Sequence, residues 1–177
     1  AAAIATAISA ATIDTAANVG VTVDNGAVTA ANLNTIDANT GAVVDASAVV
    51  TSITGTAAEF ATLITTNAAT TTLAVNYAAT ITGGATVAQA NVVDADTSGV
   101  VTATISDGDM ATLANLTGDN NAYTVTVTDT SVDAAALNTL DGKTTVNVVA
   151  TAATTLTGTA AAIATAISAA TIDTAAN

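Results

Sequence analysis

Six short runs along the chain are rich in β-branched residues, and most of them alternate between an apolar residue and threonine. Alternation with a period of two is typical of a strand that buries one face and exposes the other. The runs that predict strands are Val21–Val23, Val43–Val44, Leu73–Tyr77, Val101–Ile105, Tyr123–Thr128 and Val146–Val149. We therefore expect short strands with valine on one face and threonine on the other.

Short helix-like runs lie between these strands. Thr56–Glu59 has the Thr-x-x-Glu pattern of a capping box, in which the threonine and glutamate side chains satisfy backbone amides at a helix start. Apolar residues then follow at helical spacing, at Phe60, Leu63 and Ile64. This segment is predicted to be a helix with one buried face.

Two further helix starts follow the same logic. Ser106 with Asp109 predicts a capping box before Met110, and Thr159 predicts the start of a helix over Ala160–Ile167. Helices of two or three turns are marginal alone, because an isolated helix in water needs roughly 12–15 residues. Packing against the strands must therefore stabilise them.

The first eighteen residues of the chain return as its last eighteen. The sequence AAAIATAISAATIDTAAN occupies residues 1–18 and again residues 160–177, an offset of 159 positions (160 − 1). So long an identical match is not due to chance. We interpret residues 1–177 as a single repeat region: one 159-residue period, residues 1–159, and an 18-residue overlap, residues 160–177, into the next.

Shorter repeats divide this period. The pattern at Ile53–Ala58 recurs at Leu156–Ala161, with a degenerate version at Ile105–Gly108. Three such units fill the period, and each contains two strand-plus-helix halves of roughly 26 residues, within the ~20–29 range of strand-plus-helix solenoids. The predicted fold is α/β: a right-handed solenoid of about 26-residue coils, each a strand plus a short helix, with a stacked parallel sheet. A pure β-solenoid is the alternative.

Composition favours a thin, regular core. Aromatic residues make up 2% of the chain, namely Phe60, Tyr77 and Tyr123, so a compact globule would bury little apolar area per residue. In a solenoid, each coil is covered by its neighbours instead. Neither of the long uncharged stretches, Phe60–Val93 and Thr144–Ile172, is apolar enough for a membrane span, and no basic segment predicts a signal peptide.

Charge and missing residue types exclude several classes of function. The net charge of −13 would repel nucleic acid and anionic membranes, which leaves divalent cations as plausible ionic partners. The chain has no His or Cys and one basic residue, Lys143, so Ser–His and Cys–His catalysis are impossible. We predict that the protein is not an enzyme and needs no cofactor, although calcium remains possible.

One segment partly resembles a calcium-binding loop. Asp94, Asp96 and Ser98 place oxygen atoms at alternate positions, and Gly99 stands at the sixth. The twelfth position is Ile105, where a bidentate glutamate would be required. These three residues are a weak calcium candidate, and an acidic, solvated turn is the preferred interpretation.

An Asn-x-x-Asp pattern recurs along the chain. Its asparagines are Asn34, Asn91 and Asn138, and its aspartates are Asp37, Asp94 and Asp141. The asparagines could form a binding row, but the pattern favours side chains that satisfy backbone groups at the same corner of successive coils. The aspartates lie near helix C-termini, which is electrostatically unfavourable, so a turn or capping role must compensate.

The threonine-bearing strands suggest one more function. Threonines at alternate positions of stacked strands would form a hydroxyl array that resembles the ice-binding faces of some solenoid antifreeze proteins. The rows are uneven here, with Thr22 alone in one strand against Thr124, Thr126 and Thr128 in another. Ice binding is therefore an alternative rather than the main hypothesis.

The segment Val100–Thr144, VVTATISDGDMATLANLTGDNNAYTVTVTDTSVDAAALNTLDGKT, resembles the tandem repeats of giant secreted bacterial surface or adhesin-type proteins, including cyanobacterial and marine bacterial ones. The resemblance implies a location outside the cell or at the bacterial cell surface, and no catalytic residues. We predict a structural repeat protein that forms or extends a filament, surface fibre or adhesin stalk. Its expected partners are identical repeats or subunits joined head-to-tail, and a calcium-responsive adhesin segment is an alternative.

Overall fold

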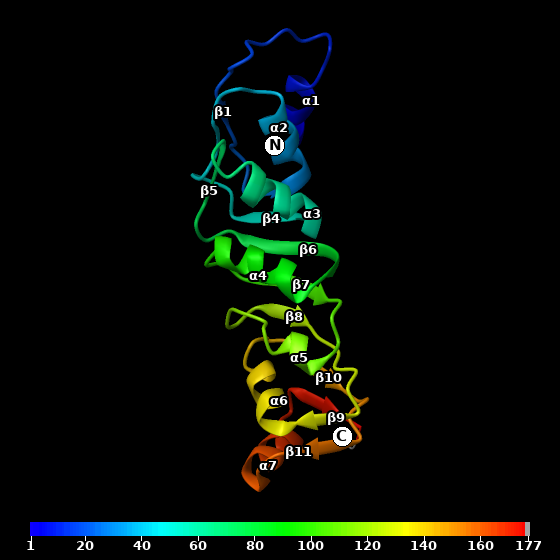
Figure 1. The fold of residues 1–177 in the computed structure, drawn as a ribbon. Helices are drawn as coiled ribbons and strands as arrows, with labels where there is room; N and C mark the ends of the chain where they lie inside the picture. Colours follow the sequence, from blue (N-terminus) through cyan, green and yellow to red (C-terminus); the bar gives the residue numbers. More distant parts are fainter. Residues whose placement is uncertain (176–177) are drawn as a thin grey trace. The chain divides into compact units, whose positions relative to one another are not determined.

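The computed structural model describes residues 1–175 and divides the chain into two compact units. The first unit contains Ala1–Thr82 and Ala95–Val100, and the second contains Gly83–Asp94 and the chain from Val101 onward. Both are mixed α/β, with short strands and helices that alternate along the chain (Figure 1). The last two residues of the second 18-residue copy, 176–177, lie outside the described residues.

The first unit contains two parallel ladders. Its elements are α1 (Ala2–Ile8), β1 (Val21–Thr22), β2 (Ala27–Thr29), α2 (Ala30–Ala38), β3 (Val44–Ala46), β4 (Ser52–Thr56), α3 (Ala57–Ala61), the π-helical turn η1 (Thr62–Thr66) and β5 (Thr71–Leu73). Strands β1, β3 and β5 form one ladder. The other joins β2, β4 and the start of β6 (Ala78–Ala85), which continues into the second unit. Helix α4 (Val87–Asp96) begins in the second unit and ends in the first.

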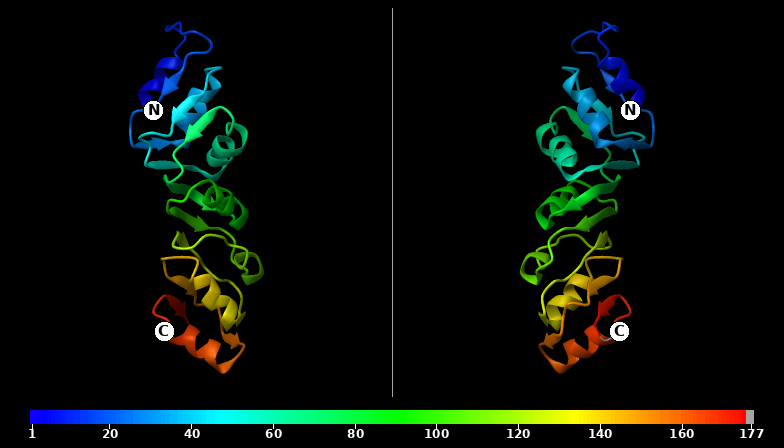
Figure 2. Two further views of the ribbon diagram at one scale, coloured as in Figure 1. Left: turned by 90° about the vertical axis from the view of Figure 1, so that its left-hand side faces the viewer. Right: turned by 90° about the vertical axis from the view of Figure 1, so that its right-hand side faces the viewer.

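The second unit is built from the same kinds of elements, short parallel strands and short helices. Its further elements are β7 (Val101–Ile105), α5 (Met110–Leu113), β8 (Ala122–Thr124), β9 (Ser131–Asp133), α6 (Ala134–Asp141), β10 (Val148–Ala150), β11 (Thr155–Thr157), α7 (Ala160–Ser168) and β12 (Ile172–Thr174). Parallel pairs join β7 to β8, β9 to β11, and β10 to β12. Helices α6 and α7 pack side by side, as Figure 2 shows.

Strands pair with strands one strand–helix step further along the chain. The paired residues are 20 positions apart at Thr102 and Ala122 (122 − 102) and 27 apart at Val44 and Thr71 (71 − 44), and the other ladders fall between these values. Parallel strands need such a crossover, because a tight turn can only join antiparallel neighbours. Each crossover therefore has to contain the helix and turns of one step.

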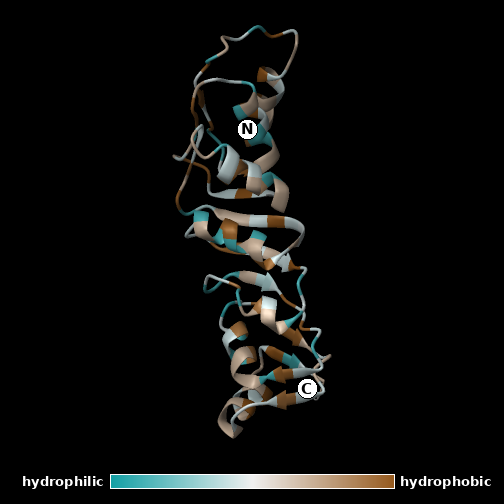
Figure 3. Ribbon diagram, in the orientation of Figure 1, coloured by the Kyte–Doolittle hydropathy of each residue, from teal (hydrophilic) through white to brown (hydrophobic). Residues whose placement is uncertain are grey.

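Side-chain alternation decides which face of each strand is buried. In β7, Val101, Ala103 and Ile105 are buried while Thr102 and Thr104 are exposed. Figure 3 shows short hydrophobic stretches along the strands separated by paler residues. The largest fully buried side chains are aromatic, with Phe60 and Tyr77 in the first unit and Tyr123 in the second. Small residues fill most of the remaining core.

Within residues 1–175, every α-helix after α1 begins at a side-chain cap. Each cap oxygen accepts a hydrogen bond from the backbone amide three residues further on, at Thr29, Thr56, Thr86, Asp109, Asp133 and Thr159. The mean step between them is 26 residues, (159 − 29)/5, which agrees with the step expected from the sequence. The predicted capping box at Thr56 and Glu59 and the predicted start at Thr159 are confirmed.

Several local predictions were wrong. Leu73–Tyr77 is not a strand: the strand is Thr71–Leu73, whose register follows from its pairing with β3, and Tyr77 enters the core before β6. Ser106 does not cap a helix, because Asp109 is itself the cap of α5. The pure β alternative is excluded by the helices in the Ala-rich runs. Within residues 1–175, none of the helices has the length and apolar character that a membrane crossing requires.

Candidate functional site

Three equivalent corners carry the recurring polar residues. The α2 corner is Asn34 with Asp37, the α4 corner is Asn91 with Asp94, and the α6 corner is Asn138 with Asp141. Within each corner the two residues are three positions apart, so both side chains project from the same face of the helix. Each lies in the last two turns of its helix, beside the segment that comes next in the chain.

The asparagine of each corner donates to a backbone carbonyl about 25 residues ahead. Asn34 Nδ2 donates to the Glu59 carbonyl at 3.0 Å. Asn91 Nδ2 donates to the Asn115 carbonyl at 2.8 Å, and Asn138 Nδ2 to the Ala162 carbonyl at 3.0 Å. The acceptors belong to the next helix or to the residues directly after it. The prediction that these asparagines satisfy backbone groups in the following step is confirmed.

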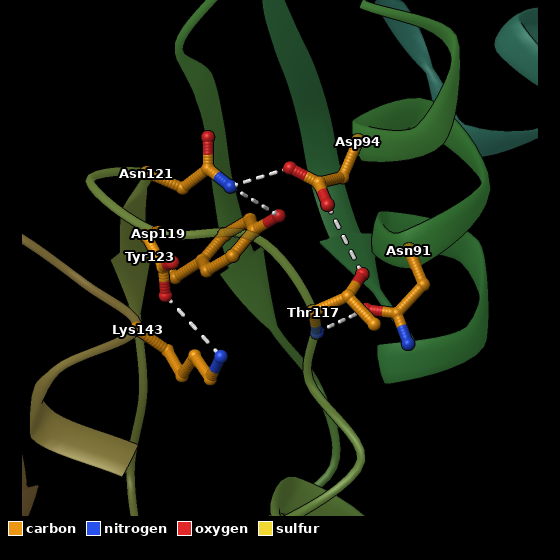
Figure 4. Close-up of polar contacts among 7 residues, drawn as sticks. All are labelled: Asn91, Asp94, Thr117, Asp119, Asn121, Tyr123 and Lys143. Atoms are coloured by element: carbon orange, nitrogen blue, oxygen red, sulfur yellow. Dashed lines mark hydrogen bonds and ion pairs between the residues drawn. The ribbon is translucent and has the colours of Figure 1, made fainter. Parts of the chain in front are cut away.

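The α4 corner is the most fully bonded of the three (Figure 4). Asn91 Oδ1 accepts the backbone amide of Thr117 at 2.9 Å, and Asp94 Oδ2 accepts the Thr117 hydroxyl at 3.0 Å. Asp94 Oδ1 accepts Asn121 Nδ2 at 2.7 Å. The loop after α5 is therefore bonded to both side chains of the corner.

Asn121 extends this network into the core. It is 3% exposed; its Oδ1 accepts the Val101 amide at 2.8 Å, and its Nδ2 also donates to Tyr123 Oη at 3.0 Å. Burial raises the pKa of the Tyr123 phenol, the negative charge of Asp94 raises it further, and the hydrogen bond from Asn121 opposes them. The phenol is therefore neutral at ordinary pH and serves as an apolar filler with one polar contact.

The α2 and α6 corners use fewer bonds. Asn34 Oδ1 accepts Asn67 Nδ2 at 3.1 Å, and Asp37 Oδ1 accepts the Thr71 hydroxyl at 3.1 Å. At the α6 corner, Asp141 Oδ2 accepts the Thr171 hydroxyl at 2.8 Å. The other oxygens of that corner, Asn138 Oδ1 and Asp141 Oδ1, are buried and find no donor within residues 1–175.

A threonine completes each motif and bonds in the opposite direction along the chain. Thr40, Thr97 and Thr144 each follow the aspartate by three residues. Their hydroxyls donate to the carbonyls of Val19, Tyr77 and Tyr123, at 2.6, 2.6 and 2.7 Å. Each hydroxyl also accepts the backbone amide two residues ahead, which closes the turn after the helix.

The sequence signal for this threonine was present but was missed. The full motif is Asn-x-x-Asp-x-x-Thr, at residues 34–40, 91–97 and 138–144. The partners Asn67, Thr71, Thr117, Asn121 and Thr171 were also missed, and no local pattern could have found them. They share no spacing, because the loops that carry them differ in length.

The calcium candidates lie in the last turn of α4 and just after it, with separate partners. Asp94 belongs to the α4 corner, Asp96 Oδ2 accepts the Tyr77 hydroxyl at 2.7 Å, and Ser98 donates to the Val75 carbonyl at 3.1 Å. Asp94 and Asp96 are helical, so the expectation of an acidic turn at these two residues was wrong. Within the described chain, no group of three His, Cys, Asp or Glu side chains is placed to hold a metal ion. Calcium binding by these three residues stays the weak candidate that it was from the sequence.

The one lysine makes an exposed ion pair. Lys143 Nζ lies 3.2 Å from Asp119 Oδ1, and the aspartate side chain is 74% exposed (Figure 4). Such pairs contribute about 0–1 kcal/mol, because water screens the charges.

Comparison with protein-family models, with curated proteins and with solved structures found no match. The arrangement of the polar residues thus connects successive parts of the chain, and the absence of enzymatic activity stays a prediction.

Proposed function

We propose that this protein is a structural repeat segment of a bacterial filament, surface fibre or adhesin stalk outside the cell. In this proposal the chain is a right-handed solenoid whose coils are the strand–helix steps, and its function is to provide length. The observation that carries the proposal is the repetition of one bonding scheme. The Asn-x-x-Asp-x-x-Thr motif bonds forward through its asparagine and aspartate and backward through its threonine at each of its three occurrences.

The ladder geometry supports the same proposal. Parallel pairs join strands 20 to 27 residues apart, so each step is covered by the step that follows it. Such nearest-neighbour contacts are typical of solenoids, in which stability is a sum over adjacent steps. A core made largely of Ala and Val suffices under these conditions, because each small side chain is enclosed from two sides. The net charge of −13 would keep such a fibre hydrated and would limit lateral association.

Electron microscopy and fibre diffraction of the native, full-length protein test this proposal. Six coils at ~4.8 Å each predict an axial period of about 29 Å for each 159 residues, and aligned fibres should give a meridional reflection near ~4.8 Å. The intact mass would show whether the periods form one polypeptide or separate subunits. A compact particle with no axial repeat would overturn the fibre.

A second candidate function, ice binding, is favoured by one exposed array in the first unit. Thr54 on β4 is in register with Thr80 on β6, and Thr56 is in register with Thr82. All four lie on the strand face opposite the core; Thr56, Thr80 and Thr82 are exposed, and Thr54 is half-exposed. Along each strand the hydroxyls repeat every second residue, roughly 6.6–6.8 Å, and between strands at roughly 4.8 Å.

Thermal hysteresis of the purified protein separates this candidate from the fibre. An ice binder depresses the freezing point below the melting point, and Thr80→Lys with Thr82→Lys should abolish that gap by disrupting the array. Thr155→Lys in the second unit is the matched control, because it is also an exposed strand threonine but its sheet contains neither β4 nor β6. A wild-type protein without hysteresis would rule out ice binding and leave the fibre untouched.

A further inference from the structure

The two identical 18-residue copies bury opposite faces of the same helix. In the first copy Ala5 is 5% exposed and Ala7 is exposed. In the second copy the equivalent of Ala5, Ala164, is exposed, and the equivalent of Ala7, Ala166, is fully buried. Positions two apart on an α-helix differ by about 200°, so these are opposite faces.

The neighbours of the two helices explain this difference. Helix α1 packs against α2, which follows it in the chain, whereas α7 packs against α6, which precedes it. The same sequence therefore packs one face on the next helix and the other face on the previous helix. Each copy displays only one of these two contacts.

The strand after each helix shows the same asymmetry. Ile172 is 2% exposed, and the strand Ile172–Thr174 pairs in parallel with Val148–Ala150. Its equivalent in the first copy, Ile13, is 49% exposed, and residues 13–15 form no strand. An apolar groove lies beside them, lined by Ile4, Ala7, Ile8, Thr15 and residues 19–22. Ala7, whose equivalent is buried in the second copy, thus lines an open groove.

We propose that residues 1–18 dock onto a second copy of this chain, in the arrangement that residues 160–175 display within their own chain. The Ala7 face of α1 packs on α6 of the second copy, and residues 13–15 form a strand beside its β10. The register places Ile13 opposite Val148, Asp14 opposite Val149 and Thr15 opposite Ala150. This inference rests on the proposed fibre and names the contact that joins its subunits.

The physical reason is that the incoming and outgoing segments are identical. When residues 1–18 of one copy replace residues 160–177 of another, they can form the same ladder and the same bonds to Asn138 and Asp141. Exchange of identical elements is a low-cost route to association, and a head-to-tail contact between different surfaces stays open at both ends. The product is a linear chain of subunits rather than a closed dimer.

Engineered disulfides test the register, because the natural sequence has no cysteine. Adjacent parallel strands are ~4.8 Å apart, which lies within the range of a disulfide. Val149→Cys with Asp173→Cys is the positive control, and it should close within one chain. Val149→Cys with Asp14→Cys should give a series of covalent oligomers on oxidation, whereas Val149→Cys with Thr6→Cys should not. If the positive control closes while the variant with Asp14→Cys stays monomeric on oxidation, the docking is overturned.

The same substitution in the two copies should have opposite effects. Ile172→Asp weakens β12 and frees β10 of the same chain, so the oligomeric fraction in analytical ultracentrifugation should rise at least about two-fold. Ile13→Asp weakens the incoming strand, so oligomers should be lost. The double variant should be monomeric. Equal sedimentation of the two single variants would contradict the proposal. If Ile172→Asp fails to fold, the disulfide experiment alone decides.

Failure of the docking and failure of the fibre give different results. Native fibres that persist in the Ile13→Asp variant would leave the fibre standing and disprove this contact. Disulfide-linked oligomers together with native material that forms no fibres would leave the docking standing and disprove the proposed function.

Discussion

The α4 and α6 corners begin from closely similar residues, Asn-Val-Val-Asp and Asn-Thr-Leu-Asp, and reach different degrees of hydrogen bonding. At the α4 corner all four side-chain polar groups of Asn91 and Asp94 have partners. At the α6 corner two buried oxygens find none within residues 1–175. The difference comes from the loop after the next helix, because Thr117 and Asn121 reach the α4 corner.

The stabilisation that a corner provides therefore depends on the loop that follows it. The helix supplies an asparagine and an aspartate, which cost free energy when they are buried without donors. The following loop supplies the hydrogen-bond donors. The bonds that they form offset this cost and stabilise the corner. Variants that remove a group from one corner and its equivalent from the other can measure this contribution.

The largest effect is expected from Gly118→Ala. Gly118 has a φ of +76°, and an added Cβ would meet the side chains of Asn121 and Asp94. Backbone strain and loss of the Asp94–Asn121 bond should together lower the free energy of unfolding by about 3 kcal/mol or more, measured by urea denaturation. Gly142→Ala after α6 is the control, because it has helical φ and ψ; we expect a change within about 0.5 kcal/mol.

Asp94→Ala should be the next most damaging change. It removes two accepted bonds and leaves the buried amide of Asn121 with a weaker set of partners, so the expected loss is about 2 kcal/mol. Asp141→Ala removes one bond and also one buried oxygen that has no donor, so its loss should stay below about 1 kcal/mol. Equal losses of unfolding free energy in urea denaturation would mean that the loop after α5 adds no stability to the α4 corner.

Alkaline pH should destabilise the chain through its two tyrosines. Burial raises the pKa of Tyr77, and the hydrogen bond to Asp96 and the negative charge of Asp96 raise it further. Burial and the negative charge of Asp94 raise the pKa of Tyr123. A raised pKa in the folded state means that this stability is present below the unfolded pKa of 10.0 and is lost as pH rises above it.

Circular dichroism and tyrosinate absorbance between roughly pH 9 and 12 measure this loss. Ionisation of the phenols should coincide with unfolding, because the folded state resists it. The Tyr123→Phe variant keeps the apolar filling of the α4 corner and removes one of the two titrating groups. Phenols that ionise near pH 10 while the fold persists would contradict the prediction.

The smallest effect is expected from Lys143→Ala. The ion pair with Asp119 is exposed, so its loss should change the free energy of unfolding by less than about 0.5 kcal/mol. Salt should reduce even this difference, because it screens exposed charges. A loss above about 1 kcal/mol, independent of salt, would show that Lys143 has a structural role at the α6 corner beyond its charge.

The success of sequence-based prediction varied with how local each feature is. Thr56, Glu59 and Thr159 were recognised as helix starts because a cap needs only the next three residues. The strand Val101–Ile105 was predicted to the residue because its alternation is uninterrupted. Leu73–Tyr77 failed because pairing with β3, distant in the sequence, fixes the register of Thr71–Leu73.

The corners were predicted in part for the same reason. The asparagines recur at recognisable positions, and their role in satisfying backbone groups followed from chemistry. Their partners did not, because Asn67 and Asn121 reach their corners across loops of different length. A pattern with a constant period cannot identify residues whose spacing varies.

The sequence by itself determined the strand–helix step of about 26 residues, the helix starts at Thr56 and Thr159, and which face of Val101–Ile105 is buried, because each depends on neighbours along the chain. Only the tertiary structure decided whether a given run becomes a strand. Residues 13–15 and 172–174 have the same sequence, Ile-Asp-Thr. Only the second segment forms a strand, since β10 lies beside it. A strand of three residues has too few bonds of its own and exists only where another backbone completes it.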